Sequence, residues 1–422
     1  MDNGRDVLVL SGTRTPIGKY GGGLAAVPPC DLAATVVRES VSRAGVDPSD
    51  VGHAVFGNVI HTETRDMYLS RVAAVNGGLP VETPAFTLNR LCGSGLQAIV
   101  SAAQAIKLGD CEVAVAGGAE SMSRGQYWLP SLRWGQRMQD TVAVDAMVGA
   151  LTDPFDDCHM GVTAENVATD FSVSRADQDA LAVESHRRAA AASEAGYFKE
   201  QITPIEVKGR KGTVTVDADE HIRPGVTTDD LAKLKPSFAR DGTVTAGNAS
   251  GINDAAAAVV LADVAFAERH GHQPLGRLVA YSHAGVEPRI MGMGPVPAVR
   301  KVLDRAGHRA WRCRGSGGRR GGVDEPRPVL GARAPVGAAD ARRCRHRRHG
   351  RRADRSVRRV SHGGHRGERG HRLRRVPGGP GRAGHREPSP GGRGHRRWLF
   401  HRADHAHRGA GPQGHHHHLR HR

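Results

Sequence analysis

Apolar and polar positions along the first 120 residues follow two periods, and each period predicts a different element. Short apolar runs predict buried strands at DVLVLSG (6–12), GHAVFGNV (52–59), PAFTL (84–88) and CEVAVAGGAES (111–121). Apolar residues three or four positions apart predict helices at CDLAATVVRESVSRAG (30–45) and from about Leu96 to Leu108. This alternation of strands and helices predicts an α/β fold built in layers.

Local patterns mark where several elements begin and end. Asp31 is expected to cap the first helix, because its carboxylate can accept hydrogen bonds from free N–H groups, and Gly45 is expected after the last turn. The pattern SRAD, which begins at Ser174, resembles a capping box and predicts a helix that ends near Gly196. The run GNASGINDAAAAVVLAD (247–263) predicts a glycine-rich turn, then a helix and a strand.

The regular strand–helix order is lost between about Ser121 and Thr243, where helices alternate with polar loops. The pair Gly117 and Gly118, just before this stretch, is expected in a tight turn. Further on, RLVAYSHAGVEPRIMGMGPVPAVRKVLDRAG (277–307) repeats the strand, loop and helix of the N-terminal segment, and both copies close on Arg-Ala-Gly. We interpret the chain as a duplicated α/β fold with an insertion that covers one face of the body.

Charge divides the chain at about residue 308. Residues 308–422 contain 31 arginines, no lysine and 7 acidic residues, a net charge of +24, whereas residues 1–307 carry −7. The same segment lacks isoleucine, methionine, threonine, asparagine and lysine, the five residues whose codons all begin with adenine. So polar a segment cannot bury enough apolar surface to order itself, and we expect disorder. We interpret it as GC-rich DNA read out of frame, with a genuine Arg- and His-rich tail as the alternative.

No part of the sequence predicts export or a membrane span. The N-terminal MDNGRD is polar, and the longest apolar run, Ala255 to Ala262, is far too short to cross a bilayer. The six cysteines are scattered, without the spacing of a disulfide framework or a metal site. We therefore expect a cytoplasmic protein with reduced thiols and no bound metal.

One cysteine stands where covalent chemistry is expected. In TLNRLCGSGLQAI (87–99), Cys92 lies between a predicted strand and a predicted helix, with Gly93 and Gly95 beside it. The dipole and free N–H groups of a helix N-terminus favour a thiolate, and the glycines let a bulky ligand approach the backbone. This arrangement suits acyl transfer through a thioester. The alternative is a buried structural cysteine in a tight turn.

Five motifs in residues 1–307 resemble those of the thiolases, most closely the acetyl-CoA acetyltransferase and short-chain β-ketothiolase branch. They are NRLCGSGLQAI (89–99), GGAESMSR (117–124), HMGVTAENVA (159–168), GTVTAGNASGINDAAAA (242–258) and GMGPVPA (292–298). The resemblance implies an α/β fold of the thiolase type, layered αβαβα. Its N-terminal domain would span residues 1–120 and 244–270, a covering loop domain 121–243, and the start of an incomplete C-terminal domain 271–307. The aberrant basic tail, 308–422, falls outside this architecture.

The resemblance also implies a reaction and a site. Cys92 would take an acyl group from one acyl-CoA, and the enolate of acetyl-CoA would attack that thioester to give a 3-ketoacyl-CoA, or the reverse. No resident cofactor is implied, because coenzyme A thioesters are the substrates. Acyl-CoA and CoA are the expected partners, with a homo-oligomer if the C-terminal half were intact. The residues implied to bind substrate are Leu151, His159, Met160, Arg223, Phe238, Ala246 and Ser250.

Each implied binding residue has a structural alternative. His159 and Met160 would line the acyl and pantetheine pocket and favour short substrates, and Arg223 would face the nucleotide phosphates. Without a substrate role, His159 would be a satisfied loop histidine, Arg223 a solvated charge, and Ser250 the cap of a following helix. Leu151, Met160 and Phe238 would then be core residues.

Three thiolase motifs have no match in this chain. The family places Asn-Glu-x-Phe, Gly-His-Pro and Cys-x-Gly motifs in its C-terminal half, and these supply the histidine that activates the nucleophile, the groups that stabilise the enolate and the acid/base cysteine. CRGSGG at Cys313 comes too early and lies in the aberrant segment. We therefore expect little or no activity from this chain. The alternatives are a non-catalytic CoA-binding protein and a nucleic-acid binder, although a tail without lysine and with few aromatic residues disfavours the latter.

The out-of-frame interpretation predicts that another forward frame of the gene, from about codon 295 to its end, encodes the three missing motifs in order. Resequencing that region and translating all three frames checks this. If the present frame is confirmed and no other frame encodes the motifs, the basic tail is genuine.

Overall fold

The structure is a computed structural model that describes residues 6–210 and 212–307, which belong to one compact unit. The segment predicted to be disordered, residues 308–422, lies outside the described residues, as does Cys313. No helix of the described part combines the length and apolarity that crossing a bilayer requires.

Strands far apart in the sequence meet in one mixed sheet. Within the described residues its members are β1 (Val7–Arg14), β2 (Gly18–Lys19), β3 (Val51–Gly57), β4 (Ala85–Leu88), β5 (Val113–Ser121), β12 (Asn253–Asp263) and β13 (Gly276–Arg277). The order is β13-β1-β12-β5-β3-β4, and β2 pairs with β12. β12 is antiparallel to β1 and β5, whereas β3 is parallel to β5 and β4.

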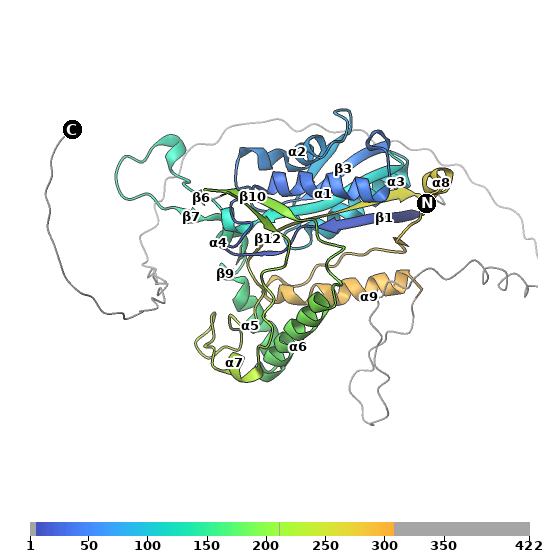
Figure 1. The fold of residues 1–422 in the computed structure, drawn as a ribbon. Coiled ribbons are helices and arrows are strands. Elements are labelled where there is room, and N and C mark those ends of the chain that lie inside the picture. Colours follow the sequence, from blue (N-terminus) through green and yellow to red (C-terminus); the bar gives the residue numbers. More distant parts are fainter. Residues whose placement is uncertain (1–5, 211, 308–422) are drawn as a thin grey trace, which may run out of the picture. The chain divides into compact units, whose positions relative to one another are not determined.

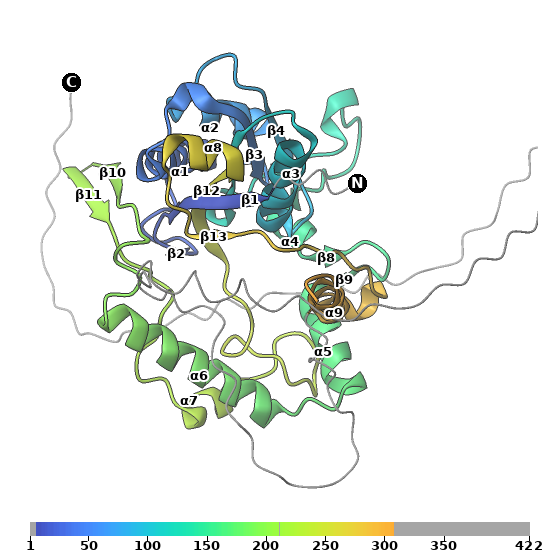
Figure 2. The same ribbon diagram turned by 90° about the vertical axis from the view of Figure 1, so that its right-hand side faces the viewer.

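Helices cover both faces of this sheet, as Figures 1 and 2 show. On one face lie α1 (Pro29–Ala44), α2 (Leu69–Asn76) and α8 (Val264–His270), and on the other lies α3 (Ser94–Leu108). Alternate residues of β5 serve the two faces: Val113 and Val115 pack with the α1 side, and Ala114 and Ala116 with the α3 side. A strand buried on both faces is apolar throughout, which is why the sequence pattern revealed β5 so clearly.

The alanine-rich run predicted to begin a helix is instead the central strand β12, so this prediction was wrong. Ala258 lies opposite Gly117 of β5 and opposite Thr13 of β1, which fixes the strand on both sides. Alanine favours helices, but pairing with two neighbouring strands overrides that weak preference. Gly117 and Gly118, expected in a tight turn, also lie within a strand, so this prediction was wrong too: Gly117 lets β5 approach β12, and Gly118 lies against Gly57 and Gly95.

Replacing Gly117 with alanine should destabilise the fold by about 1–3 kcal/mol, because overpacked sites force backbone shifts. The new Cβ would lie 2.2 Å from the Ala257 carbonyl oxygen and 2.8 Å from Phe56 Cε1. Gly276→Ala is the matched control, since a Cβ there meets no heavy atom within 4 Å. Urea unfolding of both variants checks this, and equal midpoints for Gly117→Ala and Gly276→Ala would contradict it.

The predicted helix boundaries are correct except at Asp31. Gly45 follows α1 with a φ of +64°, and the Ser174 hydroxyl accepts a hydrogen bond from the Asp177 N–H at 3.1 Å at the start of α6 (Arg175–Glu194). The helix α6 ends at Glu194, near the predicted Gly196. Asp31 is not the cap of α1, because the helix begins earlier, at Pro29. Proline is already fixed in a helical φ and needs no N–H partner, so it starts the helix before Asp31 is reached.

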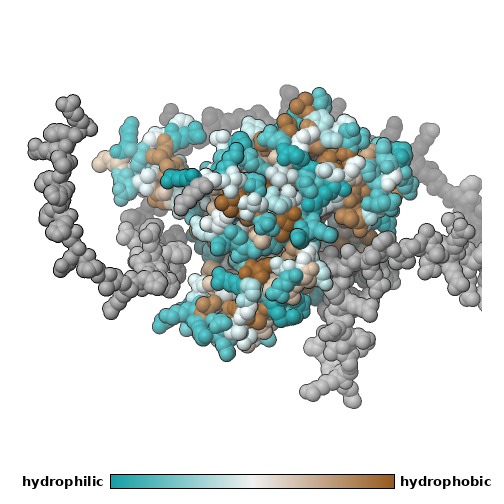
Figure 3. All heavy atoms as spheres, viewed as in Figure 1, coloured by the Kyte–Doolittle hydropathy of each residue, from teal (hydrophilic) through white to brown (hydrophobic). Residues whose placement is uncertain are grey.

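The segment between β5 and β12 is built from short hairpins and helices, where a covering insertion was predicted. Its elements are β6 (Tyr127–Trp128), β7 (Val144–Asp145), α4 (Ala146–Ala150), β8 (Thr152–Asp153), β9 (Cys158–His159), α5 (Met160–Asp170), α6, β10 (Ile205–Gly209), β11 (Gly212–Val216) and α7 (Thr228–Ala232). The loop between β6 and β7 exposes large apolar side chains, among them Trp134 and Met138, and lies at the left in Figure 3.

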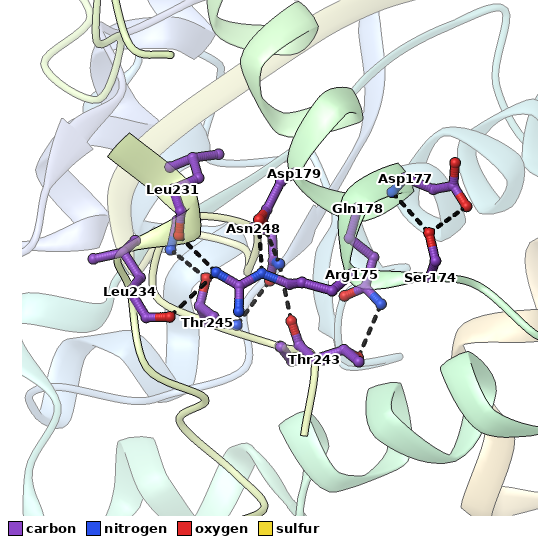
Figure 4. A network of polar contacts seen from close by, with 12 residues as sticks. Ser174, Arg175, Asp177, Gln178, Asp179, Leu231, Leu234, Thr243, Thr245 and Asn248 are labelled. Carbon is purple, nitrogen blue, oxygen red and sulfur yellow. Dashed lines mark hydrogen bonds and ion pairs between the residues drawn. The ribbon is translucent and has the colours of Figure 1, made fainter. Parts of the chain in front are cut away.

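A polar network ties this covering segment to the chain that leads into β12 (Figure 4). Arg175 of α6 donates to Asp179 Oδ2 at 2.7 Å and to the carbonyl oxygen of Leu231 in α7 at 2.6 Å. Asp179 is buried, and its other oxygen accepts from Asn248 Nδ2 at 2.9 Å. Asn248 also donates to the carbonyl oxygen of Thr243 at 3.1 Å. Because the buried Asp179 has partners on both oxygens, the loop at residues 243–248 is held against α6.

The predicted second copy is only partly formed within the described residues. The strand expected near residues 277–282 is limited to β13, which pairs with β1 of the first sheet, so that prediction needs correction. The chain then runs along α3, where Gln104 Nε2 donates to Tyr281 Oη at 2.8 Å. After a 3₁₀ turn, Pro288–Met293, comes α9 (Pro295–Arg305), which buries none of its residues. Backbone pairing with β1 continues one residue further, where the Leu278 N–H donates to the Val7 carbonyl oxygen at 2.9 Å, and the described strand pairing ends there.

Candidate active site

Cys92 lies in a strained turn between β4 and α3. Gly93 is the N-cap residue of α3, and the Cys92 side chain is exposed. Leu91, immediately before it, has a φ of +47°, in the left-handed region that leucine rarely adopts. Such a conformation costs roughly 1–2 kcal/mol and persists only where neighbouring groups hold it. The turn is therefore built to present the residue after Leu91.

Two polar side chains hold this turn. Asn89 Oδ1 accepts from the Leu91 N–H at 2.8 Å. The Ser94 hydroxyl accepts from the Arg90 N–H at 2.8 Å and donates to the Leu91 carbonyl oxygen at 2.7 Å. Neither residue was predicted from the sequence. An asparagine whose side chain accepts from the N–H two residues later forms an Asx-turn, and this pattern could have indicated Asn89.

Glycines let the first turn of α3 approach the strand ends. A Cβ on Gly57, the last residue of β3, would lie 2.6 Å from Ser94 Cβ. A Cβ on Gly118 of β5 would lie 3.3 Å from the Gly57 carbonyl oxygen and 3.6 Å from Gly95 Cα. Side chains at these positions would push α3 away from the sheet and move Cys92 with it.

The Cys92 thiol opens on a largely apolar cavity of about 420 Å³. Leu151 lines this cavity, as do Gly95 and Ala256. A Cβ added to Gly95 would meet no heavy atom within 4 Å, so the glycine leaves open space beside Cys92.

Glu120 is the carboxylate among the described residues that line the cavity. Its oxygens accept from the N–H groups of Val59 and Ile60, at 2.9 and 3.0 Å, and from Asn58 Nδ2 at 3.2 Å. Burial raises the pKa of Glu120 to about 7, and the two backbone N–H groups oppose that shift because they favour the carboxylate. Glu120 is thus a group that can change its charge near neutral pH beside Cys92.

A chain of contacts leads from this cavity to a second one. The Met160 N–H donates to the Leu151 carbonyl oxygen at 2.7 Å, and His159 is paired with Thr152 in the β8–β9 hairpin. The His159 ring stacks on Phe238, with centroids 4.8 Å apart and planes 13° apart. Its Nδ1 accepts from the Gly161 N–H at 3.0 Å, and burial lowers the pKa of His159, so a neutral ring is favoured.

Gly161 is a second position that the sequence analysis did not assign. A Cβ there would lie 2.2 Å from the Phe238 ring, so only glycine lets this ring lie flat on the start of α5. The glycine of the HMG motif therefore determines where Phe238 lies.

The second cavity, of about 440 Å³, brings together four of the predicted binding residues. Arg223, Phe238, Ala246 and Ser250 all line it. Ser250 does not cap a helix, because the following residues enter β12, and its hydroxyl contacts the Gly251 carbonyl oxygen at 3.4 Å. The structure thus places Leu151 with Cys92 at one cavity, the other four at the second, and His159 and Met160 between them.

This arrangement of sheet, Cys92 turn and covering segment coincides with that of a known family. A family model of the thiolase N-terminal domain matches residues 7–265. The chain belongs to the thiolase family. The predicted family and its α/β fold are thereby confirmed.

Thiolases from several sources are similar to this chain in sequence. Beta-ketothiolase BktB from Cupriavidus necator is 64% identical over 304 residues, which cover 72% of this chain and 77% of that protein. An acetyl-CoA acetyltransferase from Chromobacterium violaceum is 48% identical over 304 residues, with the same coverage of both chains.

Solved thiolase structures share the fold. The acetyl-CoA acetyltransferase of Bacillus anthracis superposes with a TM-score of 0.70 at 45% identity, over 72% of this chain and 77% of that chain. Human mitochondrial 3-ketoacyl-CoA thiolase in complex with CoA gives a TM-score of 0.69 at 42% identity, over 72% and 76%.

Iodoacetamide should alkylate Cys92 before the other described cysteines at pH 8. Cys92 is exposed, whereas burial raises the pKa of Cys30 to about 12 and of Cys111 to about 11, and the pKa of Cys158 is also raised by burial. A pKa of about 11 lies about two units above the ordinary value of a thiol and leaves on the order of 100-fold less reactive thiolate on Cys111, so Cys111 should be labelled slowly.

Peptide mapping by mass spectrometry over time distinguishes these thiols from each other. The fast-labelled peptide should disappear in Cys92→Ser and remain in the matched control Cys158→Ser. Equal rates at Cys92 and Cys111 would show that the Cys92 turn is not open as described.

Proposed function

We propose that this chain binds short acyl-CoA thioesters and takes up their acyl group as a thioester on Cys92. The observation that carries the proposal is the exposed Cys92 thiol at the start of α3, which faces a largely apolar cavity. The contacts described above link this cavity to a second one, which Lys19 and Arg223 line. The relatives support the reaction class, since their names describe ketothiolases and acetyl-CoA acetyltransferases, and one solved thiolase is a complex with CoA.

The chemistry proceeds through the Cys92 sulfur. Its thiolate attacks the thioester carbonyl carbon, the bond between that carbon and the CoA sulfur breaks, and CoA leaves as a thiolate. In the synthetic direction the enolate of acetyl-CoA attacks the acyl-Cys92 carbonyl, so that a 3-ketoacyl-CoA forms and the Cys92 thiolate returns. Thiolytic cleavage is the same sequence in reverse.

The two cavities suit the two ends of the substrate. The first is apolar and of modest volume, which favours a short acyl group near Cys92. Leu151 lines the first cavity, and His159 and Met160 lie between the two cavities. These three residues would contact the pantetheine arm. Arg223 and Ser250 would then meet the nucleotide end in the second cavity, with Phe238 and Ala246 as its apolar wall.

We further propose that acyl transfer by this chain is slow. Of the described residues that line the Cys92 cavity, none is a histidine, so none matches the base that thiolases use. Glu120 is held by three N–H donors, an arrangement that occupies its oxygens. The same observation supports the second candidate function, a protein that binds CoA without turnover.

A thiolysis assay with acetoacetyl-CoA and free CoA tests this proposal. Turnover should be at least about 10³-fold below that of the Bacillus anthracis acetyl-CoA acetyltransferase, because catalytic groups that act together are lost together. Any residual turnover should be lost in Cys92→Ser and kept in Cys158→Ser. Near-normal turnover by this chain would contradict the expected impairment, and turnover that survives in Cys92→Ser would contradict the role of Cys92.

A further inference from the structure

The second cavity carries more positive charge than the implied residues alone account for. Lys19 and His221 line it beside Arg223. Neither Lys19 nor Arg223 forms an ion pair with a carboxylate among the described residues. Two cations without an acidic partner on one wall are expected to attract an anion.

Glu220 also lines this cavity but is directed toward backbone groups. Its Oε2 accepts from the Lys19 N–H at 3.0 Å, and its two oxygens accept from the Gly23 N–H at 3.0 and 3.1 Å. A carboxylate engaged in this way fixes the loop at residues 19–23, and it lowers the positive potential of the cavity without cancelling it.

The hydrogen bonds around Asn253 determine the form of His221. Asn253 Nδ2 donates to the Gly18 carbonyl oxygen at 3.0 Å, which fixes the orientation of the amide. The same nitrogen lies 3.4 Å from His221 Nδ1. An amide nitrogen can only donate, so His221 Nδ1 accepts and the ring proton resides on Nε2. His221 therefore offers the cavity an N–H donor while it is neutral.

His186 of α6 holds the backbone beside His221. Its Nδ1 accepts from the Arg223 N–H at 3.3 Å, and its ring lies nearly parallel to that of His221, with centroids 6.5 Å apart. Burial, together with the charges of His221 and Arg223, lowers the pKa of His186, which keeps Nδ1 free to accept. The turn at residues 221–223 is thus anchored to the covering segment.

We propose that His221, through its Nε2–H, is a phosphate ligand in the second cavity together with Lys19 and Arg223, and that His186 is the positioning residue for this turn. The ligand chemistry that two cations and a neutral N–H donor recognise is a phosphate monoester. The inference rests on the proposed function only for the identity of the natural ligand, the nucleotide end of a CoA thioester. Gly251 leaves room for the His221 ring, because a Cβ there would lie 2.3 Å from His221 Cε1.

Isothermal titration calorimetry of the full chain with adenosine 3′,5′-bisphosphate, and separately with adenosine, tests the inference. His221→Phe keeps a ring but loses the donor, and it should weaken bisphosphate binding about tenfold while leaving adenosine binding unchanged. His186→Asn, which keeps an acceptor in the place of Nδ1, should retain bisphosphate affinity, and His186→Phe should lose it. His272→Phe, outside the cavity, is the matched control and should change neither affinity.

Equal losses for the two ligands in His221→Phe, or no loss, would overturn the inference. If His221→Phe does not fold, Lys19→Met replaces it as the test. This variant should bind the bisphosphate more weakly and with a smaller dependence on salt concentration, and an unchanged affinity would overturn the inference. A wild-type chain that binds neither ligand would also overturn it. Acyl transfer to Cys92 is measured separately, so its absence alongside intact bisphosphate binding would count only against the proposed function.

Discussion

The close approach of the first turn of α3 to the ends of β3 and β5 is the constraint on which the site depends. Gly57 leaves no room for a side chain there and Gly118 leaves little, and Ser94 accepts a hydrogen bond from the Arg90 N–H of the preceding turn. Ser94 and Asn89 then hold Leu91 in a left-handed conformation, and this places Cys92 outside the sheet and beside the cavity. The reactive position is thus a consequence of backbone packing, and the strain at Leu91 is stored where chemistry is expected.

The covering segment is held in place by a second set of contacts. The buried Asp179 links α6, through Arg175 and Asn248, to the loop that enters β12, so the second cavity is formed between parts that the sheet itself does not join. By contrast, α9 is not held in this way, because none of its residues is buried. The described residues therefore form a sheet with helices on both faces and the two cavities, and no histidine is among those that line the cavity at Cys92.

Much of the fold could be predicted from the sequence because its strands are apolar on both faces and its helices end at clear capping residues, such as Gly45 and Ser174. The strand β12 could not, because alanine alone favours a helix and only the neighbours β1 and β5 decide otherwise. Cys92 could be predicted as a candidate nucleophile because Gly93 and Gly95 lie beside it at the start of a predicted helix. Asn89 and Ser94 were not predicted, because their role depends on the turn that they make. His221 and His186, separated along the chain, acquire a shared role only when α6 folds over the loop that contains His221.

If its turn presents Cys92 for acyl transfer, Cys92 should be acylated even when turnover is slow. Intact-mass spectrometry after incubation of the full chain with acetyl-CoA, followed by peptide mapping, tests this most directly. We expect slow addition of one acetyl group, located on Cys92 and absent in Cys92→Ser. An unmodified chain, or acetyl groups that are distributed among other residues and unaffected by Cys92→Ser, would show that the turn does not present Cys92 for acyl transfer.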